Sequence, residues 1–381
     1  MGDEKIRLST WGTYLTVLLV LIAGGVAMVR LLKGLGAVTN LSDAWPWGLW
    51  IGFDVVAGVA LAGGGFTLAA MVYIFNLKRY HSVVRPAILT AFLGYIMVAA
   101  GIFFDIGRPW TIWHPAVYWN FHSVMFEVAW CVMLYTSVLA LEFSPSLWER
   151  LRWKRALDLF RYILIPLVIM GIILSTLHQS SLGSLFLITP NKLHPLWYTS
   201  LLPYLFFISA IALGMSMVIF ESIASARAFK REIERPAVAG LGLGAAWVLT
   251  LYAAVRFTDL IVSGRLAEFT FGWQGWSFLV EVVPGLLLPI VLLFQKRVRE
   301  SPGWLFTAAC LVVAGMILNR LNVSIIGHSH TAQGTYFPSW MEFALTAGLV
   351  AFGFLAFKLA VKYLPVLPPR EDVAVAVSRR G

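Results

Sequence analysis

Charged residues are scarce in this chain of 381 residues. Asp, Glu, Lys and Arg make up 13% of the sequence, whereas 59% of the residues are hydrophobic, and the mean hydropathy is +0.80. Soluble globular domains carry about 25% charged residues, so the composition excludes that class. The net charge of +10 does not indicate a nucleic-acid partner, because the basic residues form short clusters between long apolar runs.

Cysteine is equally scarce: the sequence has only Cys131 and Cys310, both within apolar runs. Two thiolates cannot ligate an iron–sulfur cluster that needs four, and they provide no disulfide framework. The first apolar run follows Asp3 and Glu4 and lacks a small-residue cleavage pattern. We therefore expect a retained helix rather than a signal peptide.

Long apolar runs make up most of the chain, and a helix of about 20 such residues spans a bilayer. They predict an all-α membrane protein with about ten transmembrane helices in a single integral membrane domain, residues 1–381. The second and sixth runs exceed this length, so we expect both helices to tilt or project beyond the bilayer. The expected spans are residues 11–32, 46–77, 84–106, 121–144, 158–178, 196–225, 236–262, 275–295, 303–323 and 338–363.

Basic residues are distributed unevenly, with 22 of the 29 at the termini or in even-numbered loops. Because cytoplasmic loops are enriched in Lys and Arg, this predicts cytoplasmic termini and a bacterial inner membrane. Tryptophans gather in the odd-numbered loops as an outer interfacial belt. The basic set is Lys5, Arg7, Lys78, Arg79, Arg85, Arg150, Arg152, Lys154, Arg155, Arg161, Arg227, Lys230, Arg231, Arg235, Lys296, Arg297, Arg299, Lys358, Lys362, Arg370, Arg379 and Arg380.

Three pairs of similar motifs recur at spacings of 149, 154 and 154 residues. Four helices separate the members of each pair, so both copies have the same orientation. This pattern predicts a parallel repeat of two four-helix bundles, helices 2–5 (residues 46–178) and helices 6–9 (residues 196–323), flanked by helices 1 and 10. The pairs are Pro46 with Pro195, Asp105 with Asp259, and Glu127 with Glu281.

Ionisable residues within the helices lie almost entirely in their outer third to half. Each costs at least about 2.5–3.5 kcal/mol to insert, so each needs a reason. The set is Asp54, Asp105, Arg108, His122, Glu127, His178, Arg256, Asp259, Glu281, Arg320 and Glu342. We interpret the first six, on four neighbouring helices at one depth, as a functional site.

The other ionisable residues have simpler explanations. Arg256 and Asp259 are three residues apart, so we expect them to neutralise each other. Arg320 lies beside two asparagines and is expected to tie the bundles together. Glu342 is expected to reach the membrane surface.

Quinone chemistry fits the outer cluster better than haem or a metal. A b-type haem needs facing histidines at one depth, and of the seven histidines we place only His122 and His178 in the membrane. No clustered metal-ligand motif is present. A quinone enters from the bilayer, is bound between aromatic walls, and needs hydrogen-bond donors and proton-transfer groups. Trp50 and Asp54, four residues apart, are expected to share a helix face in such a site.

The sequence resembles the NrfD/PsrC family of quinone-interacting membrane subunits, and within it the HybB branch that accompanies membrane-bound nickel–iron hydrogenases. The resemblance covers helices 2 to 9. Its motifs are WPWGLWIGFD (residues 45–54), FDIGRPW (104–110), SVMFE (123–127), STLHQSSLGSL (175–185), HPLWY (194–198) and LNRLNV (318–323).

The resemblance implies two four-helix bundles and a menaquinone site near the periplasmic face of the first. It implies no haem, despite the common label of cytochrome b subunit, and no iron–sulfur cluster in this chain. Electrons would pass between the quinone and a docked periplasmic iron–sulfur (ferredoxin-like) subunit, itself bound to a [NiFe]-hydrogenase or another redox catalytic subunit.

By matching motif positions, the resemblance assigns quinone contacts or proton transfer to Asp54, Asp105, Arg108, His122, Glu127 and His178. We expect His178 or Asp105 to provide the proton-donating hydrogen bond, Glu127 to take part in proton transfer, and Arg108 to orient the quinone or balance charge.

Two other functions use the same features. A secondary transporter would bind an ion or substrate with the buried charges, and Gly63, Gly64, Gly65, Pro284 and Pro289 would allow unwound helices. However, transporter sites lie near the midplane and are often built from inverted repeats. A passive anchor for a periplasmic redox enzyme would not need buried charges. The sequence does not decide whether protons are translocated.

Overall fold

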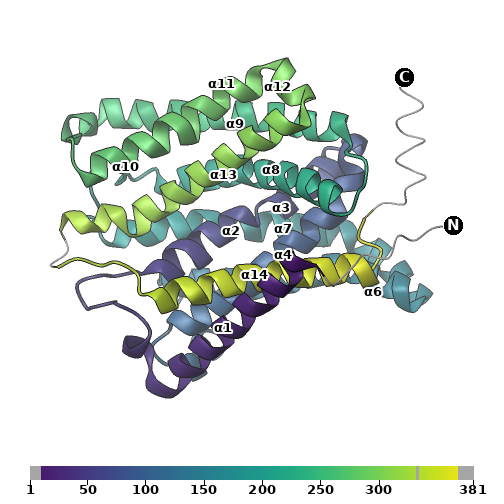
Figure 1. Cartoon of the computed structure of the whole chain (residues 1–381), viewed down its shortest axis with the longest axis horizontal. Helices are drawn as coiled ribbons and strands as arrows, with labels where there is room; N and C mark the ends of the chain where they lie inside the picture. Colours follow the sequence, from purple (N-terminus) through teal and green to yellow (C-terminus); the bar gives the residue numbers. More distant parts are fainter. Residues whose placement is uncertain (1–9, 332–333, 368–381) are drawn as a thin grey trace.

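The computed structural model describes residues 10–331 and 334–367. Within these residues the chain is helical, and ten helices are long and apolar enough to cross a membrane, which confirms the predicted architecture (Figure 1). The ten spans are Trp11–Lys33 (α1), Trp50–Ile74 (η2, α2, α3 and η3), Lys78–Asp105 (η4 and α4), Val124–Leu151 (α6), Lys154–Ile188 (α7 and η6), Leu202–Ala228 (α8), Arg235–Val262 (α9), Trp273–Phe294 (α10, η8 and α11), Pro302–His330 (α13 and η9) and Trp340–Tyr363 (α14).

Short helical segments connect the spans. They are η1 (Leu35–Ala37), η5 (Pro109–Thr111), α5 (His114–Val117), η7 (Arg265–Glu268) and α12 (Lys296–Glu300). Proline follows the N-cap at the start of α8, α9 and α13, where its missing N–H has no helical partner to lose. Ser123 caps α6 by accepting from the backbone N–H of Phe126.

Several helices differ in length from the sequence prediction, among them the second, fourth and fifth spans. The second span has 25 residues rather than the expected 32, because the Trp45-Pro46-Trp47 segment precedes the helix. α6 and α7 instead extend through charged residues to Leu151 and from Lys154. Hydropathy places a helix end at the first charges, but charged residues such as Glu149 and Lys154 are good helix formers.

The second span is interrupted near its centre, between α2 (Gly58–Leu61) and α3 (Gly64–Ala69). Here it crosses α8 backbone to backbone: a Cβ added at Gly214 would lie 2.4 Å from the carbonyl carbon of Gly63 and 2.5 Å from the amide nitrogen of Gly64. The glycines therefore serve close packing. Close packing accounts for Gly63 and Gly64 without an unwound helix of the kind that a transporter would use.

Gly214→Ala is expected to destabilise the protein by about 1–3 kcal/mol, because the added methyl meets backbone that cannot rotate away. Gly24→Ala is the matched control, since a Cβ there has nothing within 4 Å. The measurement is thermal unfolding in detergent, followed by a thiol-reactive dye that reports exposure of Cys131 and Cys310, which are both free. Equal melting temperatures for the two variants would contradict this account of the crossing.

α1 and α14 pack side by side on the flank of the molecule, and α14 also contacts α4 (Figure 1). A small core joins them, formed by Ala23, Val26, Val38, Trp50 and Leu345. The second span in turn contacts α8 and α13. The two predicted bundles thus share a packed interface, while their relation as a parallel repeat stays a prediction.

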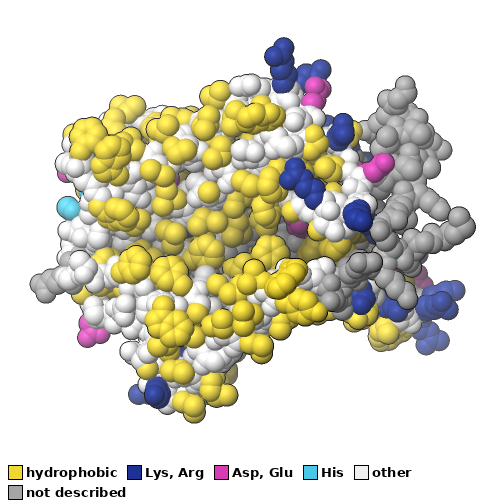
Figure 2. All heavy atoms as spheres, viewed as in Figure 1, with side chains coloured by type: hydrophobic (Ala, Val, Ile, Leu, Met, Phe, Trp, Pro, Cys, Tyr) yellow, Lys and Arg dark blue, Asp and Glu magenta, His cyan; other side chains and the backbone are white. Residues whose placement is uncertain are grey.

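The two ends of the helices differ in composition. Lys and Arg side chains gather at one end, which we term the basic end, as Figure 2 shows. The opposite end, termed the aromatic end, carries most of the tryptophans of the connecting loops, among them Trp45, Trp47, Trp110, Trp113 and Trp119. With an even number of spans, Trp11 and Tyr363 lie at the same end. The predicted terminal basic residues Lys5, Arg7, Arg370, Arg379 and Arg380 lie outside the described residues.

Candidate functional site

A first group of polar residues, here termed the Asp54 cluster, lies where the second span meets α4, α1 and α14. Asp54 is 6% exposed, and its Oδ2 accepts a 2.7 Å hydrogen bond from Thr346 Oγ1. α4 also packs closely against Asp54: a Cβ added at Gly101 of α4 would lie 2.9 Å from Asp54 Cβ. The cluster comprises Arg30, Trp50, Asp54, Asp105, Glu342 and Thr346.

Asp105 is the last residue of α4 and is close enough to Asp54 for a Coulombic interaction. Its Oδ1 is buried and has no hydrogen-bond partner among the described residues. Charging two interacting carboxyl groups at the same time is costly inside a membrane. This arrangement can hold and release protons.

Arg30, which the sequence prediction did not include, provides the positive charge of the Asp54 cluster. It is 1% exposed, and its guanidinium donates to the carbonyl oxygens of Phe104 and Ile106 at 2.7 and 2.6 Å. These carbonyls end α4, so the cation both caps the helix and faces Asp105. The sequence feature that could have identified Arg30 as a site residue is its position within the apolar first helix.

Glu342 does not reach the membrane surface, and that expectation was wrong. It is 1% exposed and forms a capping box with Ser339 at the start of α14. Its carboxylate also accepts from Tyr336 Oη and from the backbone N–H of Asn40 at 3.1 Å. Its carbonyl accepts a 3.3 Å bond from Trp50 Nε1. Trp50 and Asp54 therefore both face α14, as their spacing predicted.

A second group, termed the His178 cluster, lies inside the bundle of α4, α6 and α7. His178 is completely buried, and its Nδ1 is 2.9 Å from Tyr95 Oη. Four polar atoms here are buried without a partner among the described residues: Tyr135 Oη, Ser175 Oγ, His178 Nε2 and Gln179 Oε1. Orphaned polar groups in such a row usually indicate bound water or a ligand.

The remaining candidates lie nearer the surface of the aromatic end. Glu127 is exposed, and its Oε1 accepts a 2.5 Å bond from Ser181, one turn along α7 from His178. Arg108 and His122 are exposed on the loops that follow α4 and precede α6. The structure thus divides the predicted site into the Asp54 cluster, the His178 cluster and three residues near the surface, Arg108, His122 and Glu127.

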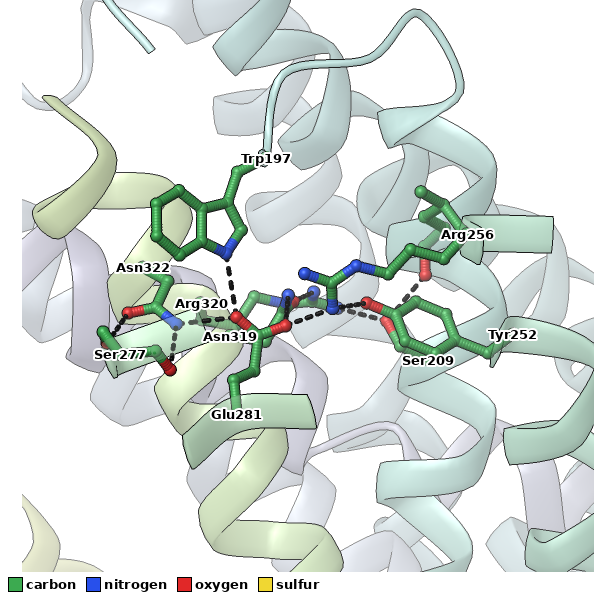
Figure 3. A network of polar contacts seen from close by, with 10 residues as sticks. Trp197, Ser209, Tyr252, Arg256, Ser277, Glu281, Asn319, Arg320 and Asn322 are labelled. Carbon is green, nitrogen blue, oxygen red and sulfur yellow. Dashed lines mark hydrogen bonds and ion pairs between the residues drawn. The ribbon is translucent and has the colours of Figure 1, made fainter. Parts of the chain in front are cut away.

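A buried ion network joins α8, α9, α10 and α13 in the second half of the chain (Figure 3). Glu281 pairs with Arg256 and accepts further hydrogen bonds from Asn319, Asn322 and Trp197 at 2.8, 2.6 and 2.8 Å. The expectation that Arg256 pairs with Asp259 was wrong. The arginine side chain reaches inward to α10, whereas Asp259 lies 3.6 Å from Arg265 at the end of α9.

Arg320 belongs to the same network but does not tie the two predicted bundles together, as the sequence had suggested. It donates to Asn319 Oδ1 at 2.8 Å and to Ser209 Oγ at 2.7 Å (Figure 3). It also lies over the Phe206 ring. Ser209 and Phe206 are on α8, so the contact joins α8 to α13. With Arg256, Arg320 and Glu281, the network holds two cations and one anion.

His328 is a buried histidine that the sequence prediction placed in a loop. It is 1% exposed in η9, its ring lies edge-on to Trp47 at 5.4 Å, and neither ring nitrogen has a partner among the described residues. No group of three His, Cys, Asp or Glu side chains that could hold a metal ion occurs within residues 10–331 and 334–367.

The chain is similar to several membrane subunits of redox complexes. The family model "Polysulphide reductase, NrfD" matches residues 37–332. The probable Ni/Fe-hydrogenase 2 b-type cytochrome subunit of Escherichia coli K12 is 35% identical over 90% of this chain and 89% of that protein. The menaquinone reductase integral membrane subunit of Nitratidesulfovibrio vulgaris is 27% identical over 98% and 96% of the two chains.

A third relative, from an archaeon, has a similar name. The Hdr-like menaquinol oxidoreductase integral membrane subunit of Archaeoglobus fulgidus is 23% identical over 87% of this chain and 88% of that protein.

Proposed function

The chain belongs to the NrfD family of integral membrane proteins, and from this premise we propose that it is the quinone-interacting subunit of a respiratory oxidoreductase complex. Two relatives are named for menaquinone or menaquinol, which favours a menaquinone. The observations that carry the proposal are two carboxyl groups within electrostatic range, Asp54 and Asp105, and the buried, unpartnered Oδ1 of Asp105.

The residues of the Asp54 cluster fit a quinone head group. Menaquinone supplies two-electron redox chemistry coupled to proton uptake or release. A protonated Asp105 can donate a hydrogen bond through its unpartnered oxygen, and Thr346 orients the neighbouring Asp54. Arg30 balances the negative charge when Asp105 ionises, and Trp50 forms an aromatic wall.

The other candidate residues have different roles in this proposal. His178, hydrogen-bonded to Tyr95, and Glu127, bonded to Ser181, transfer protons within the first bundle. Arg108 and His122 are exposed at the aromatic end, where they suit contact with a docked iron–sulfur partner rather than with quinone. That partner would exchange electrons with the site.

In this proposal the aromatic end faces the periplasm and the basic end faces the cytoplasm of a bacterial inner membrane. The clustering of Lys and Arg at one end supports this orientation. Both termini are then cytoplasmic. A transporter would bind its substrate near the midplane of the membrane. The cluster of carboxyl groups lies toward one end of the helices instead, which disfavours the transporter alternative. A passive anchor would have no use for these carboxyl groups.

The experiment that tests the function is purification of the complete complex with its native partners, followed by quinone extraction and an optical spectrum. We expect bound menaquinone, quinone-dependent electron transfer, and no Soret band that belongs to this chain. Absence of any quinone effect would contradict the function.

The expected absence of haem can be tested separately, with histidine variants. His122 is exposed, whereas His178 is completely buried with its Nδ1 beside Tyr95 Oη. This difference supports the proposal that the two histidines do not act as the facing pair that a bis-histidine haem requires. The spectra of His178→Gln and His328→Gln complexes are expected to match that of the wild type. A Soret band that disappears in either variant would overturn the no-haem proposal.

A further inference from the structure

A cleft of about 1210 Å³ lies between the α1–α14 pair, the second span, α4 and α8. Figure 2 shows the surface recessed between α8 and α14, with hydrophobic side chains covering the recess. Two lining residues on α14, Val350 and Phe354, are 36% and 56% exposed, so the cleft opens toward the surrounding lipid.

Polar residues line this cleft only near its two ends. Asp54 lines it toward the aromatic end, beside its hydrogen-bond donor Thr346. At the basic end, Glu221 accepts from Thr90 at 2.6 Å, and Lys358 donates to Thr13 at 2.6 Å. The side chains between the ends are apolar. They include Leu61, Leu93, Met97, Met217, Phe220 and Phe354.

The apolar stretch is long enough for an extended hydrocarbon chain. Thr346 marks the Asp54 end on α14, and Lys358 marks the other end twelve residues later. At 1.5 Å per residue, the two ends are about 18 Å apart along the helix. The cleft therefore suits an amphiphile with a polar group at one end and a long apolar body.

The position of Asp54 decides which amphiphile fits. A phospholipid would place its charged head at the basic end and only the tips of its acyl chains beside Asp54. That arrangement would leave a buried carboxyl group against hydrocarbon, which is unfavourable. A quinone would place its ring carbonyls beside Asp54 and its isoprenoid tail along the apolar walls, so the buried carboxyl group and the apolar stretch each meet matching chemistry.

We propose that this cleft is the entry and tail-binding site of the quinone, with the isoprenoid tail lying between α14 and α8 and the head group reaching Asp54. The inference rests on the proposed function and deepens it: it names a polyprenylated quinone as the ligand class and α1 and α14 as part of the binding site. It also gives the quinone a route from the bilayer that bypasses the His178 cluster.

The test narrows the cleft without touching the head-group site. Val350→Trp fills it from α14, and Met217→Trp fills it from α8, in case the first variant fails to fold. Phe352→Trp is the matched control, since Phe352 is 43% exposed on the same helix and does not line the cleft. Each variant is purified as the complete complex.

Two measurements follow. With long-tailed menaquinone, the filled variants are expected to have a KM about tenfold higher and to retain about one tenth of the extractable quinone of the wild type, since a large part of the apolar contact is lost. With a naphthoquinone that has no tail, they are expected to turn over like the wild type. The control variant should resemble the wild type in every measurement.

Different failures have different meanings. If the filled variants use long-tailed menaquinone as well as the wild type does and keep its quinone content, the cleft inference is wrong while the proposed function stands. A phospholipid found in the cleft by native mass spectrometry, displaced in the filled variants without any change in quinone content, also overturns the inference. If the wild type uses neither quinone, the proposed function itself fails.

Discussion

Replacing Asp105 by Asn is expected to lower quinone-dependent electron transfer by about 100-fold or more, because proton transfer by a positioned side chain contributes about 10²–10⁴ to a rate. Asn has nearly the same shape as Asp and retains an acceptor oxygen, but it cannot hold or release a proton. Asp54→Asn is expected to have a similar effect, since it removes the other member of the pair while leaving an acceptor for Thr346.

The measurement is turnover of menaquinone by the complete complex in proteoliposomes, with co-purification of the partners as the check on assembly. Asp43→Asn provides the matched control, because Asp43 is an exposed carboxyl residue in the loop before the second span. Turnover above half of the wild-type value in both site variants would remove the Asp54 cluster from the mechanism. Loss of assembly in the variants would be a structural effect and is distinguished by the co-purification.

Glu281→Gln is expected to lower the free energy of unfolding by about 3–5 kcal/mol, because it removes one partner of a buried ion pair. Glu281 is 2% exposed and is the anion of a network that also holds Arg256 and Arg320 (Figure 3). Gln preserves the size of the side chain but removes the negative charge. Two guanidinium groups would then remain in the membrane interior without a counter-charge, which is unfavourable.

The expected result can be read by thermal unfolding with the same thiol-reactive dye. The double variant Glu281→Gln/Arg256→Gln should recover part of the loss, because it removes the unpaired cation as well. Glu300→Gln is the control: its partner Lys296 is 3.6 Å away on an exposed surface, where a pair contributes about 0–1 kcal/mol. If the single variant melts like the wild type, the buried pair does not stabilise the helix packing.

The number and approximate positions of the spans could be predicted from the sequence, because hydrophobic run length is a direct consequence of bilayer thickness. The concentration of ionisable residues toward one end of the helices could also be predicted. The partners that side chains find on other helices could not be predicted. Arg256 and Asp259 are suitably spaced for a local pair, but the true partner, Glu281, is 25 residues away on another helix. Spacing alone cannot show which long side chain turns inward.

Two features of the candidate site have a signal in the sequence that the prediction did not use. Ser339 and Glu342 have the spacing of a capping box, which would have predicted an inward-facing carboxylate at the start of α14. Arg30 is a cation within the apolar first helix, ahead of Lys33 at the helix end, and a buried cation calls for a partner. The separation of the six candidate residues into two clusters and three residues near the surface depends on how four helices are rotated, and sequence periodicity does not fix that rotation.

The most direct test of the central proposal is photoaffinity labelling of the complete complex with a menaquinone that carries a photoreactive group on its ring. Peptide mapping is expected to place the label on residues 50–57 or at the end of α4, around Asp105, and excess menaquinone should prevent labelling. Labelling confined to the peptides of Tyr95 and His178, or to the helices around Glu281, would contradict the placement of the quinone head group beside Asp54.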